Sequence, residues 1–116
     1  MAVSNYVFPI VMKSIDSSTF SGAYQAVNTG LDDSCFMVKY INNSTVDITI
    51  SWDGINDHDF APAHSAFVAD FQTNHQPTNE VALARKGQII YVKGSAGTGK
   101  FYLAAYTQPQ TNPRGL

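Results

Sequence analysis

Residues 94–100 come closest to a chemical motif in this chain. They read GSAGTGK, and the order glycine, four residues, glycine, lysine matches most of a phosphate-binding loop. Such a loop also needs a Ser or Thr hydroxyl after the lysine to bind Mg²⁺, and a helix whose first turn faces the phosphates. Here Phe101 follows the lysine, and residues 101–106 read FYLAAY, without the polar face of a surface helix. The stretch therefore lacks two of the features on which phosphate binding depends.

The residues around the glycines predict a β-hairpin instead. Strand-like runs at residues 88–93 and 100–106 flank the link, and the second run alternates between two faces. A glycine-rich link between two such runs is a hairpin signal, because glycine reaches positive φ without strain. A small nucleotide-binding enzyme, with Lys100 at the phosphates, is the other interpretation of the motif. In the hairpin, positive φ is expected to be available at Gly94, Gly97 and Gly99.

A second candidate site is the acidic stretch at residues 52–60, which reads WDGINDHDF. Its aspartates offer the hard oxygen ligands that Ca²⁺ takes. It is not an EF-hand loop, because Gly54 falls too early and the final glutamate is absent. Asp and Asn are also ordinary turn residues whose side chains bond nearby backbone amides. We expect a turn here, and the calcium candidates are Asp53, Asp57 and Asp59.

The remaining reactive side chains have no spacing that defines a catalytic site. Cys35 is the single cysteine, so no internal disulfide forms, and its place on a strand-like run suggests a small buried hydrophobe. The histidines lie in polar stretches without the spacing of a metal site or a catalytic triad. They are His58, His64 and His75. We expect no enzymatic activity, no catalytic residue and no cofactor.

Composition limits the class of protein and its partners. The chain has 116 residues, of which 44% are hydrophobic and only 14% charged, as expected for one globular domain with an uncharged polar surface. Low charge leaves little repulsion between copies, so a homo-oligomer is plausible. The net charge of −2, with seven Lys and Arg spread thinly, predicts no nucleic-acid partner. No apolar stretch approaches the roughly 20 residues that cross a membrane, and no signal peptide is evident.

Alternation is clearest at residues 46–52, where apolar side chains occupy every second position. A second run at residues 34–41 precedes it, and the cluster Asn42-Asn43-Ser44 predicts a polar turn between the two. The two runs together predict an antiparallel hairpin. Further strand-like runs lie at 11–15, 65–71, 88–93 and 100–106, and residues 80–84 suit a strand or a short helical turn.

These runs predict an all-β fold of seven or eight short strands in an antiparallel β-sandwich, jelly-roll or Ig-like. We divide the chain into an N-terminal arm or edge strand (1–12), the sandwich (13–107) and a C-terminal tail (108–116). The first segment is apolar, and the last has two prolines and no apolar periodicity. Both are expected to act as contact arms. The candidate partner-contact residues are Tyr6, Phe8, Ile10, Pro109, Pro113 and Arg114.

Two stretches together resemble small structural proteins of tailed bacteriophages. They are ITISWDGINDHDFAPAHSAFVADF and ALARKGQIIYVKGSAGTGKFYLAAY, and their most specific parts are the Trp-Asp-Gly turn and the Tyr-Val-Lys-Gly-x-Ala-Gly-Thr-Gly segment. The resemblance covers roughly residues 35–106. It implies a virion component made in the bacterial host cytoplasm: a capsid cement or decoration protein, or an accessory subunit of the neck or tail. Its partners would be the major capsid, neck or tail protein.

The alternative function is a carbohydrate-binding module that recognises host surface glycans. Aromatic side chains stack on sugars only if they are exposed, so burial of the tryptophan discriminates between the two functions. The candidate stacking residues are Trp52, Tyr91, Tyr102 and Tyr106.

Overall fold

The computed structural model describes residues 7–70 and 83–107, and residues 1–6, 71–82 and 108–116 lie outside the described part. Strands form where apolar side chains alternate with polar ones. In chain order they are β1 (Phe8–Pro9), β2 (Lys13–Asp16), β3 (Gln25–Ala26), β4 (Met37–Ser44), β5 (Ile48–Ser51), β6 (Asp59–Ala61), β7 (Ser65–Asp70), β8 (Tyr91–Lys93) and β9 (Gly99–Thr107). One short 3₁₀ helix, η1 (Ser17–Thr19), follows β2. No helix among these residues is long and apolar enough to span a bilayer.

Sheet A has five strands, and the long strand β9 is at its centre. The strand order is β1, β9, β4, β7, and β2 also pairs with β9. All of these pairs are antiparallel. Strands β4 and β9 face each other from Met37 opposite Tyr106 to Ser44 opposite Gly99. Strand β7 is therefore one edge of the sheet, and the N-terminal strands form the other.

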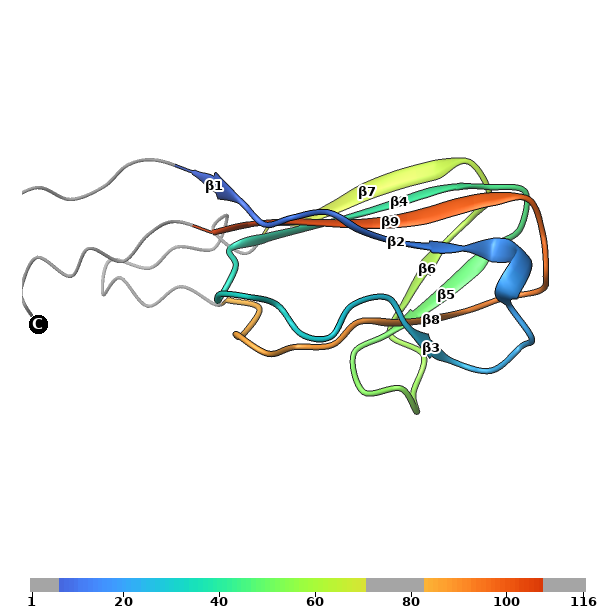
Figure 1. Ribbon diagram of the computed structural model, residues 1–116, viewed down its shortest axis with the longest axis horizontal. Coiled ribbons are helices and arrows are strands. Elements are labelled where there is room, and N and C mark those ends of the chain that lie inside the picture. The colour runs from blue at the N-terminus through green and yellow to red at the C-terminus, as the bar shows by residue number, and fades with distance from the viewer. Residues whose placement is uncertain (1–6, 71–82, 108–116) are drawn as a thin grey trace, which may run out of the picture.

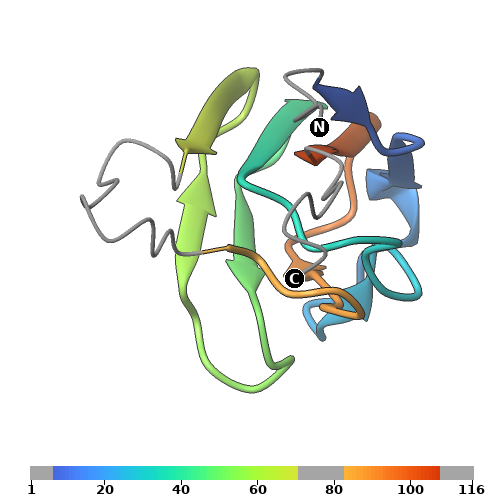
Figure 2. The ribbon, with the colours of Figure 1, turned by 90° about the vertical axis from the view of Figure 1, so that its left-hand side faces the viewer.

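Sheet B has four strands in the order β3, β8, β5, β6, again antiparallel. Figure 1 shows the two sheets as separate layers, and Figure 2 looks at the same layers from the end at which β1 begins. The prediction of an all-β antiparallel sandwich is confirmed. The described residues contain nine strands, slightly more than predicted, because very short pairings such as β1 and β3 count as strands.

The core lies between the sheets and is made of alternate residues from each strand. Tyr40 packs edge to face against Phe67, with ring centroids 5.0 Å apart. Fully burying one large apolar side chain stabilises the fold by about 1.5–3 kcal/mol. The apolar face of each strand therefore turns inward. The alternation expected at 100–106 is confirmed, and at 46–52 it holds for Ile48, Thr49 and Ile50, whereas Ser51, expected on the polar face, is also buried. The inward rows include Val38 and Tyr40 of β4, Ile48 and Ile50 of β5, and Phe101, Leu103 and Ala105 of β9.

Both predicted hairpins are wrong. Strand β4 pairs with β7 and β9 in sheet A, whereas β5 pairs with β6 and β8 in sheet B. In the same way β8 belongs to sheet B and β9 to sheet A. Each short link carries the chain from one sheet to the other, so that the apolar faces of successive strands meet in the core. Alternation reports which face of a strand is buried but not which strand lies beside it.

The turn predicted at residues 42–44 is the buried end of β4. Asn42 is only 1% exposed, and its Nδ2 donates to the carbonyl oxygens of Val46 (2.9 Å) and Ala61 (2.8 Å). Its Oδ1 accepts the backbone N–H of Ser44 at 3.2 Å. The side chain therefore ties the end of sheet A to sheet B, and the chain turns at residues 45–47 instead. Asn is a common turn residue because its amide bonds nearby backbone, and here the same property stabilises a buried corner.

The first described residues run along the edge of sheet A. Phe8 lies opposite Thr107 and Pro9 opposite Tyr106, and the backbone N–H of Ile10 donates to the carbonyl of Ala105 at 2.8 Å. Of the run predicted at 11–15, residues 13–15 lie in β2, which extends to Asp16. Of the run at 80–84 only residues 83 and 84 are described, where Ala84 makes an isolated bridge to Cys35. The predicted C-terminal tail lies outside the described residues.

Candidate functional site

Residues 94–99, here called the glycine loop, carry the chain from β8 to β9 at one end of the sandwich. Two amides of the loop are already used within the chain, and the first, Gly97 N–H, donates to the Ser17 carbonyl at 3.2 Å. Thr98 N–H donates to Thr45 Oγ1 at 3.1 Å. No helix follows, because β9 begins at Gly99 and includes Lys100. With two of its amides bonded internally and a strand behind it, the loop lacks the helix dipole on which a phosphate-binding loop depends.

The glycines are present mainly because there is no room for side chains. A Cβ at Gly94 would lie 2.7 Å from the Asp47 carbonyl oxygen, and one at Gly97 would lie 2.6 Å from Val46 Cγ1. Gly99 has φ +101°, and a Cβ there would collide with the Asn43 carbonyl. The expectation of positive φ is thus confirmed at Gly99 and wrong at Gly94 and Gly97. At those two positions, close approach to the residues after β4 excludes a side chain.

Residues 52–59, here called the acidic loop, follow β5 and project from sheet B. Asp53 Oδ1 accepts the backbone N–H groups of Ile55 and Asn56, both at 2.8 Å, and the Ser51 hydroxyl at 2.9 Å. Its Oδ2 accepts Asn56 Nδ2 at 2.9 Å. These bonds favour the carboxylate, so the backbone N–H of Asn56 and then that of Ile55 lower the pKa of Asp53. The carboxylate holds its own turn together, as expected of an Asx turn.

The other two calcium candidates point to different partners. Asp57 accepts a hydrogen bond from the Tyr24 hydroxyl and forms an ion pair with Lys93 at 3.2 Å, which together lower its pKa. Asp59 Oδ2 accepts the Tyr40 hydroxyl at 3.3 Å. Among the described residues, no three His, Cys, Asp or Glu side chains come together as a metal site. The three aspartates therefore do not form the calcium site that their spacing suggested.

The predicted sugar-stacking aromatics do not share a surface. Trp52 is partly buried, packs against the core, and its Nε1 donates to the Tyr40 hydroxyl at 3.0 Å. Tyr91 lies in sheet B with its ring against Gly54 of the acidic loop. The remaining two, Tyr102 and Tyr106, belong to β9 in sheet A. A single sugar could not contact this set.

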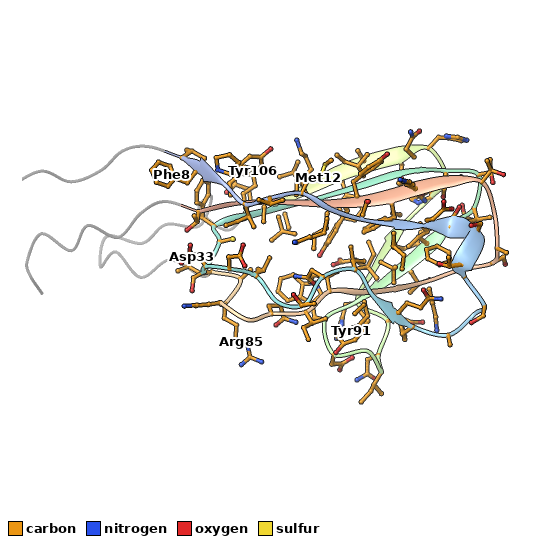
Figure 3. All side chains as sticks on the ribbon, viewed as in Figure 1. Phe8, Met12, Asp33, Arg85, Tyr91 and Tyr106 are labelled. Atoms are coloured by element: carbon orange, nitrogen blue, oxygen red, sulfur yellow. The ribbon has the colours of Figure 1, made fainter. Side chains whose placement is uncertain are left out.

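Exposed apolar residues collect on sheet A instead. Val7, Phe8, Val11 and Met12 are each at least half exposed, and they precede the first charged residue of the chain, Lys13. Figure 3 shows Phe8 and Met12 along this sheet, with Tyr106 between them in the view. Beside Met12 lies a shallow hollow of about 450 Å³. We call these four residues, together with the apolar residues of the hollow, Ile41, Ala66 and Tyr102, the sheet A surface.

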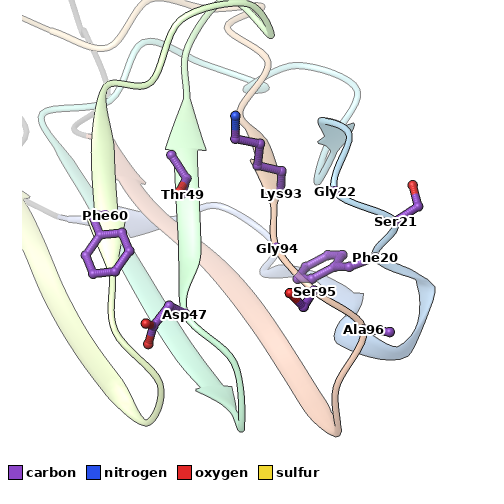
Figure 4. A pocket seen from close by; sticks show the side chains of 10 residues that line it. All are labelled: Phe20, Ser21, Gly22, Asp47, Thr49, Phe60, Lys93, Gly94, Ser95 and Ala96. Carbon is purple, nitrogen blue, oxygen red and sulfur yellow. The ribbon is translucent and has the colours of Figure 1, made fainter.

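A second hollow, of about 530 Å³, lies on the outer face of sheet B and is here called the sheet B pocket. Its floor is a row of cross-strand neighbours, since Thr49 lies opposite Phe60 of β6 and opposite Lys93 of β8. Figure 4 shows Phe60 and Phe20 on opposite sides of the pocket, with Asp47 at its lower end. The other lining residues are Ser21, Gly22, Gly94, Ser95 and Ala96.

The predicted contact residues have different outcomes. Phe8 is 50% exposed and available to a partner. Ile10 is partly buried and packs against the chain's own core, so it contributes to the fold first. The others, Tyr6, Pro109, Pro113 and Arg114, lie outside the described residues.

Sequence reasoning missed both hollows. The uncharged run before Lys13 could have indicated that Val11 and Met12 belong to a contact surface, since each is a large apolar residue in a segment without charge. No sequence signal marks Thr49 with Phe60 and Lys93, because only strand register brings them together.

Comparison with known proteins adds little to this geometry. No protein-family model matches the chain, and no curated protein matches it in sequence. A solved structure from work on disulfide-linked pili, the endospore appendages of Bacillus, aligns with a TM-score of 0.41 and 13% identity. The alignment covers 93% of this chain and 95% of that one. We draw nothing about function from a likeness of this size.

Proposed function

We propose that this protein is a non-enzymatic structural component of a tailed-phage virion that acts through protein–protein contacts. It is a capsid cement or decoration protein, or an accessory subunit of the neck or tail, made in the host cytoplasm and incorporated into the particle. Its partners are the major capsid, neck or tail protein and further copies of itself. The family resemblance of residues 35–106 motivates the virion assignment.

The observation that carries the proposal is the sheet A surface. Val11 is 72% exposed, Val7 55%, Met12 53% and Phe8 50%, all within six residues of chain. Single exposed apolar residues are common, but a contiguous group of them marks a contact surface, because each gains free energy when a partner covers it. The sheet A surface also includes the hollow beside Met12, where a partner's side chain would be received.

The experiment is to purify virions of the phage that encodes the chain and measure its copy number by quantitative gel analysis and mass spectrometry. A decoration protein is expected in proportion to the major capsid protein, and a neck or tail subunit in a few copies. Absence of the chain from purified particles would overturn the proposal.

Substitutions test whether incorporation of the protein into the virion depends on the sheet A surface. Val11→Asp with Met12→Asp adds two charges to the surface, so we expect incorporation to fall at least tenfold, as loss of about 1.4 kcal/mol of contact free energy would cause. Ile55→Asp is the matched control, because Ile55 is 79% exposed but lies in the acidic loop next to sheet B. Equal incorporation of both variants would exclude the sheet A surface as the contact.

The terminal arms are tested separately. If residues 108–116 contact a neighbouring subunit, their deletion reduces virion stability to heat without affecting folding of the isolated chain. Unchanged assembly and stability after the deletion would remove the C-terminal arm from the proposal.

A further inference from the structure

The sheet B pocket has the size and the mixed lining of a small-molecule site. Ligand pockets typically enclose about 300–1,000 Å³ and combine apolar walls with a few placed polar groups. At about 530 Å³ the sheet B pocket falls in this range. Its apolar walls are the rings of Phe60, which is 54% exposed, and Phe20, which is only 4% exposed. An exposed ring on a sheet face next to a hollow is therefore the natural place for a flat ligand.

Glycines and strand register keep the pocket open. Gly22 and Gly94 line it without side chains, and a Cβ at Gly94 would lie 3.3 Å from the Phe20 ring. Thr49 occupies the middle of the floor, directly across the strands from Phe60 and Lys93. Because the Cβ atoms of directly opposed residues lie about 5 Å apart, Phe60, Thr49 and Lys93 form one short row across the floor that a single small ligand can span.

The polar groups around the pocket include donors and acceptors on opposite sides. Asp47 Oδ1 accepts the backbone N–H of Ala63 at 2.9 Å, which holds the carboxylate at the pocket's edge. At the other side, Lys93 pairs with Asp57 at 3.2 Å, and its ammonium lies 4.6 Å from the centroid of the Tyr24 ring. The lysine charge is therefore already balanced by Asp57, so Lys93 does not select for an anion, and the Asp47 carboxylate remains an acceptor at the pocket's edge.

From this lining we infer that the sheet B pocket binds a neutral saccharide. Sugar hydroxyls both donate and accept, so one ring can donate to the Asp47 carboxylate and accept from the hydroxyl of Thr49. The C–H face of the same ring packs on Phe60, as apolar surface does on an aromatic face. An anionic ligand would meet the Asp47 carboxylate without a free cation to balance it. A hydroxyl-rich neutral ring can use the Asp47 acceptor, the Thr49 hydroxyl and the Phe60 ring together.

This inference is independent of the proposed virion role. The sheet B pocket and the sheet A surface lie on different sheets, so either can fail without the other. It also moves the carbohydrate-binding alternative from Trp52 and the tyrosines to Phe60, a residue that the sequence did not single out.

The test is binding of the full-length chain to saccharides. A glycan array of neutral and charged saccharides is probed first, and lactose, cellobiose and N,N′-diacetylchitobiose are titrated by NMR. We expect saturable binding of a neutral saccharide, with amide shifts concentrated at Thr49, Phe60 and Lys93. No neutral ligand on the array, binding of charged glycans alone, or shifts that map to other residues would each overturn the inference.

Matched variants assign the binding to the pocket. Phe60→Ala removes the ring from an exposed edge strand and should weaken the affinity at least tenfold, about 1.4 kcal/mol, whereas Phe60→Tyr retains the ring and the affinity. Asp47→Asn keeps an oxygen for the Ala63 amide but removes the carboxylate and should also weaken binding about tenfold. Phe8→Ala, which removes a similarly exposed ring from sheet A, should leave the affinity unchanged. An equal loss in Phe8→Ala, or none in Phe60→Ala, would contradict the assignment.

Discussion

The glycine loop and the acidic loop both looked like ligand sites, and both are used for internal structure, but by opposite means. The glycine loop works by the absence of side chains, since Gly94 lets the loop approach the Asp47 carbonyl and Gly97 leaves room for the Val46 and Thr45 side chains. The acidic loop works by the presence of side chains, since Asp53 and Asp57 satisfy amides, a hydroxyl and an ammonium of their own chain. A ligand at either loop would have to displace these internal partners.

The contrast explains why motif spacing misled in both places. A phosphate-binding loop needs free amides, and a calcium site needs free carboxylates. The glycines are compatible with the first and the aspartates with the second, yet two amides of the glycine loop and the carboxylates of Asp53 and Asp57 are already bonded within the chain. Whether a donor or acceptor is free is a property of tertiary structure.

The largest expected effect comes from adding a side chain to the glycine loop. Gly99→Ala combines a positive φ with a collision against the Asn43 carbonyl. We expect a loss of about 3–4 kcal/mol in the free energy of unfolding, measured by urea denaturation. Gly22→Ala is the matched control, because Gly22 has φ +89° but nothing within 4 Å of its Cβ position. It should lose only the conformational cost of about 1–2 kcal/mol. Equal losses would show that crowding is not what excludes side chains.

A smaller effect is expected in the acidic loop, where the change is local. Asp53→Ala leaves the amides of Ile55 and Asn56 without an acceptor, so their hydrogen exchange should accelerate while the core amides of β5 stay protected. The lowered pKa of Asp53 means that its contribution is present above pH 3.8 and is lost as the pH falls through its folded pKa. Asn56→Ala, which removes one donor only, is the milder control. Unchanged exchange in Asp53→Ala would show that the loop does not depend on this carboxylate.

The hydrogen bond between Tyr24 and Asp57 of the acidic loop should be detectable in a titration at high pH. Burial first, and then the hydrogen bond to Asp57, raise the pKa of Tyr24 from 10.0 to about 12. Stabilisation from this contact is therefore complete below pH 10 and is lost as the pH rises through about 12. Tyrosinate absorbance in a pH titration should contain a component near pH 12 that Tyr24→Phe removes. Asp57→Asn should lower the pKa of Tyr24 without removing its titration, and a Tyr24 that titrates near 10 would refute the contact.

The smallest effect is expected at the lysine of the glycine loop. Lys100 is exposed on β9, so Lys100→Ala should change the free energy of unfolding by less than about 0.5 kcal/mol. Titration with ATP and Mg²⁺ should show no saturable binding to either protein. Saturable binding that is lost in Lys100→Ala would restore the nucleotide-binding interpretation and end the comparison between the two loops.

Alternation in the sequence was enough to assign the faces of the strands. It placed Ile48 and Ile50 on the apolar face of one strand and Phe101 in a strand rather than a helix, and in the structure all three side chains are buried in strands. It was not enough to choose strand partners, since β4 and β5 are close in sequence yet belong to different sheets. The local pattern of side chains predicts which residues are buried, but strand pairing depends on contacts between residues far apart in the chain.

By itself, therefore, the sequence determined an all-β chain with two inward apolar rows and an uncharged N-terminal segment, because burial of alternate residues follows from a period of two. Only the tertiary structure decided that both short links cross between sheets, that Asn42 forms a buried corner, and that Thr49, Phe60 and Lys93 form one row. The physical reason is register: cross-strand neighbours are set by packing of the whole sandwich, and no local stretch of sequence contains that information.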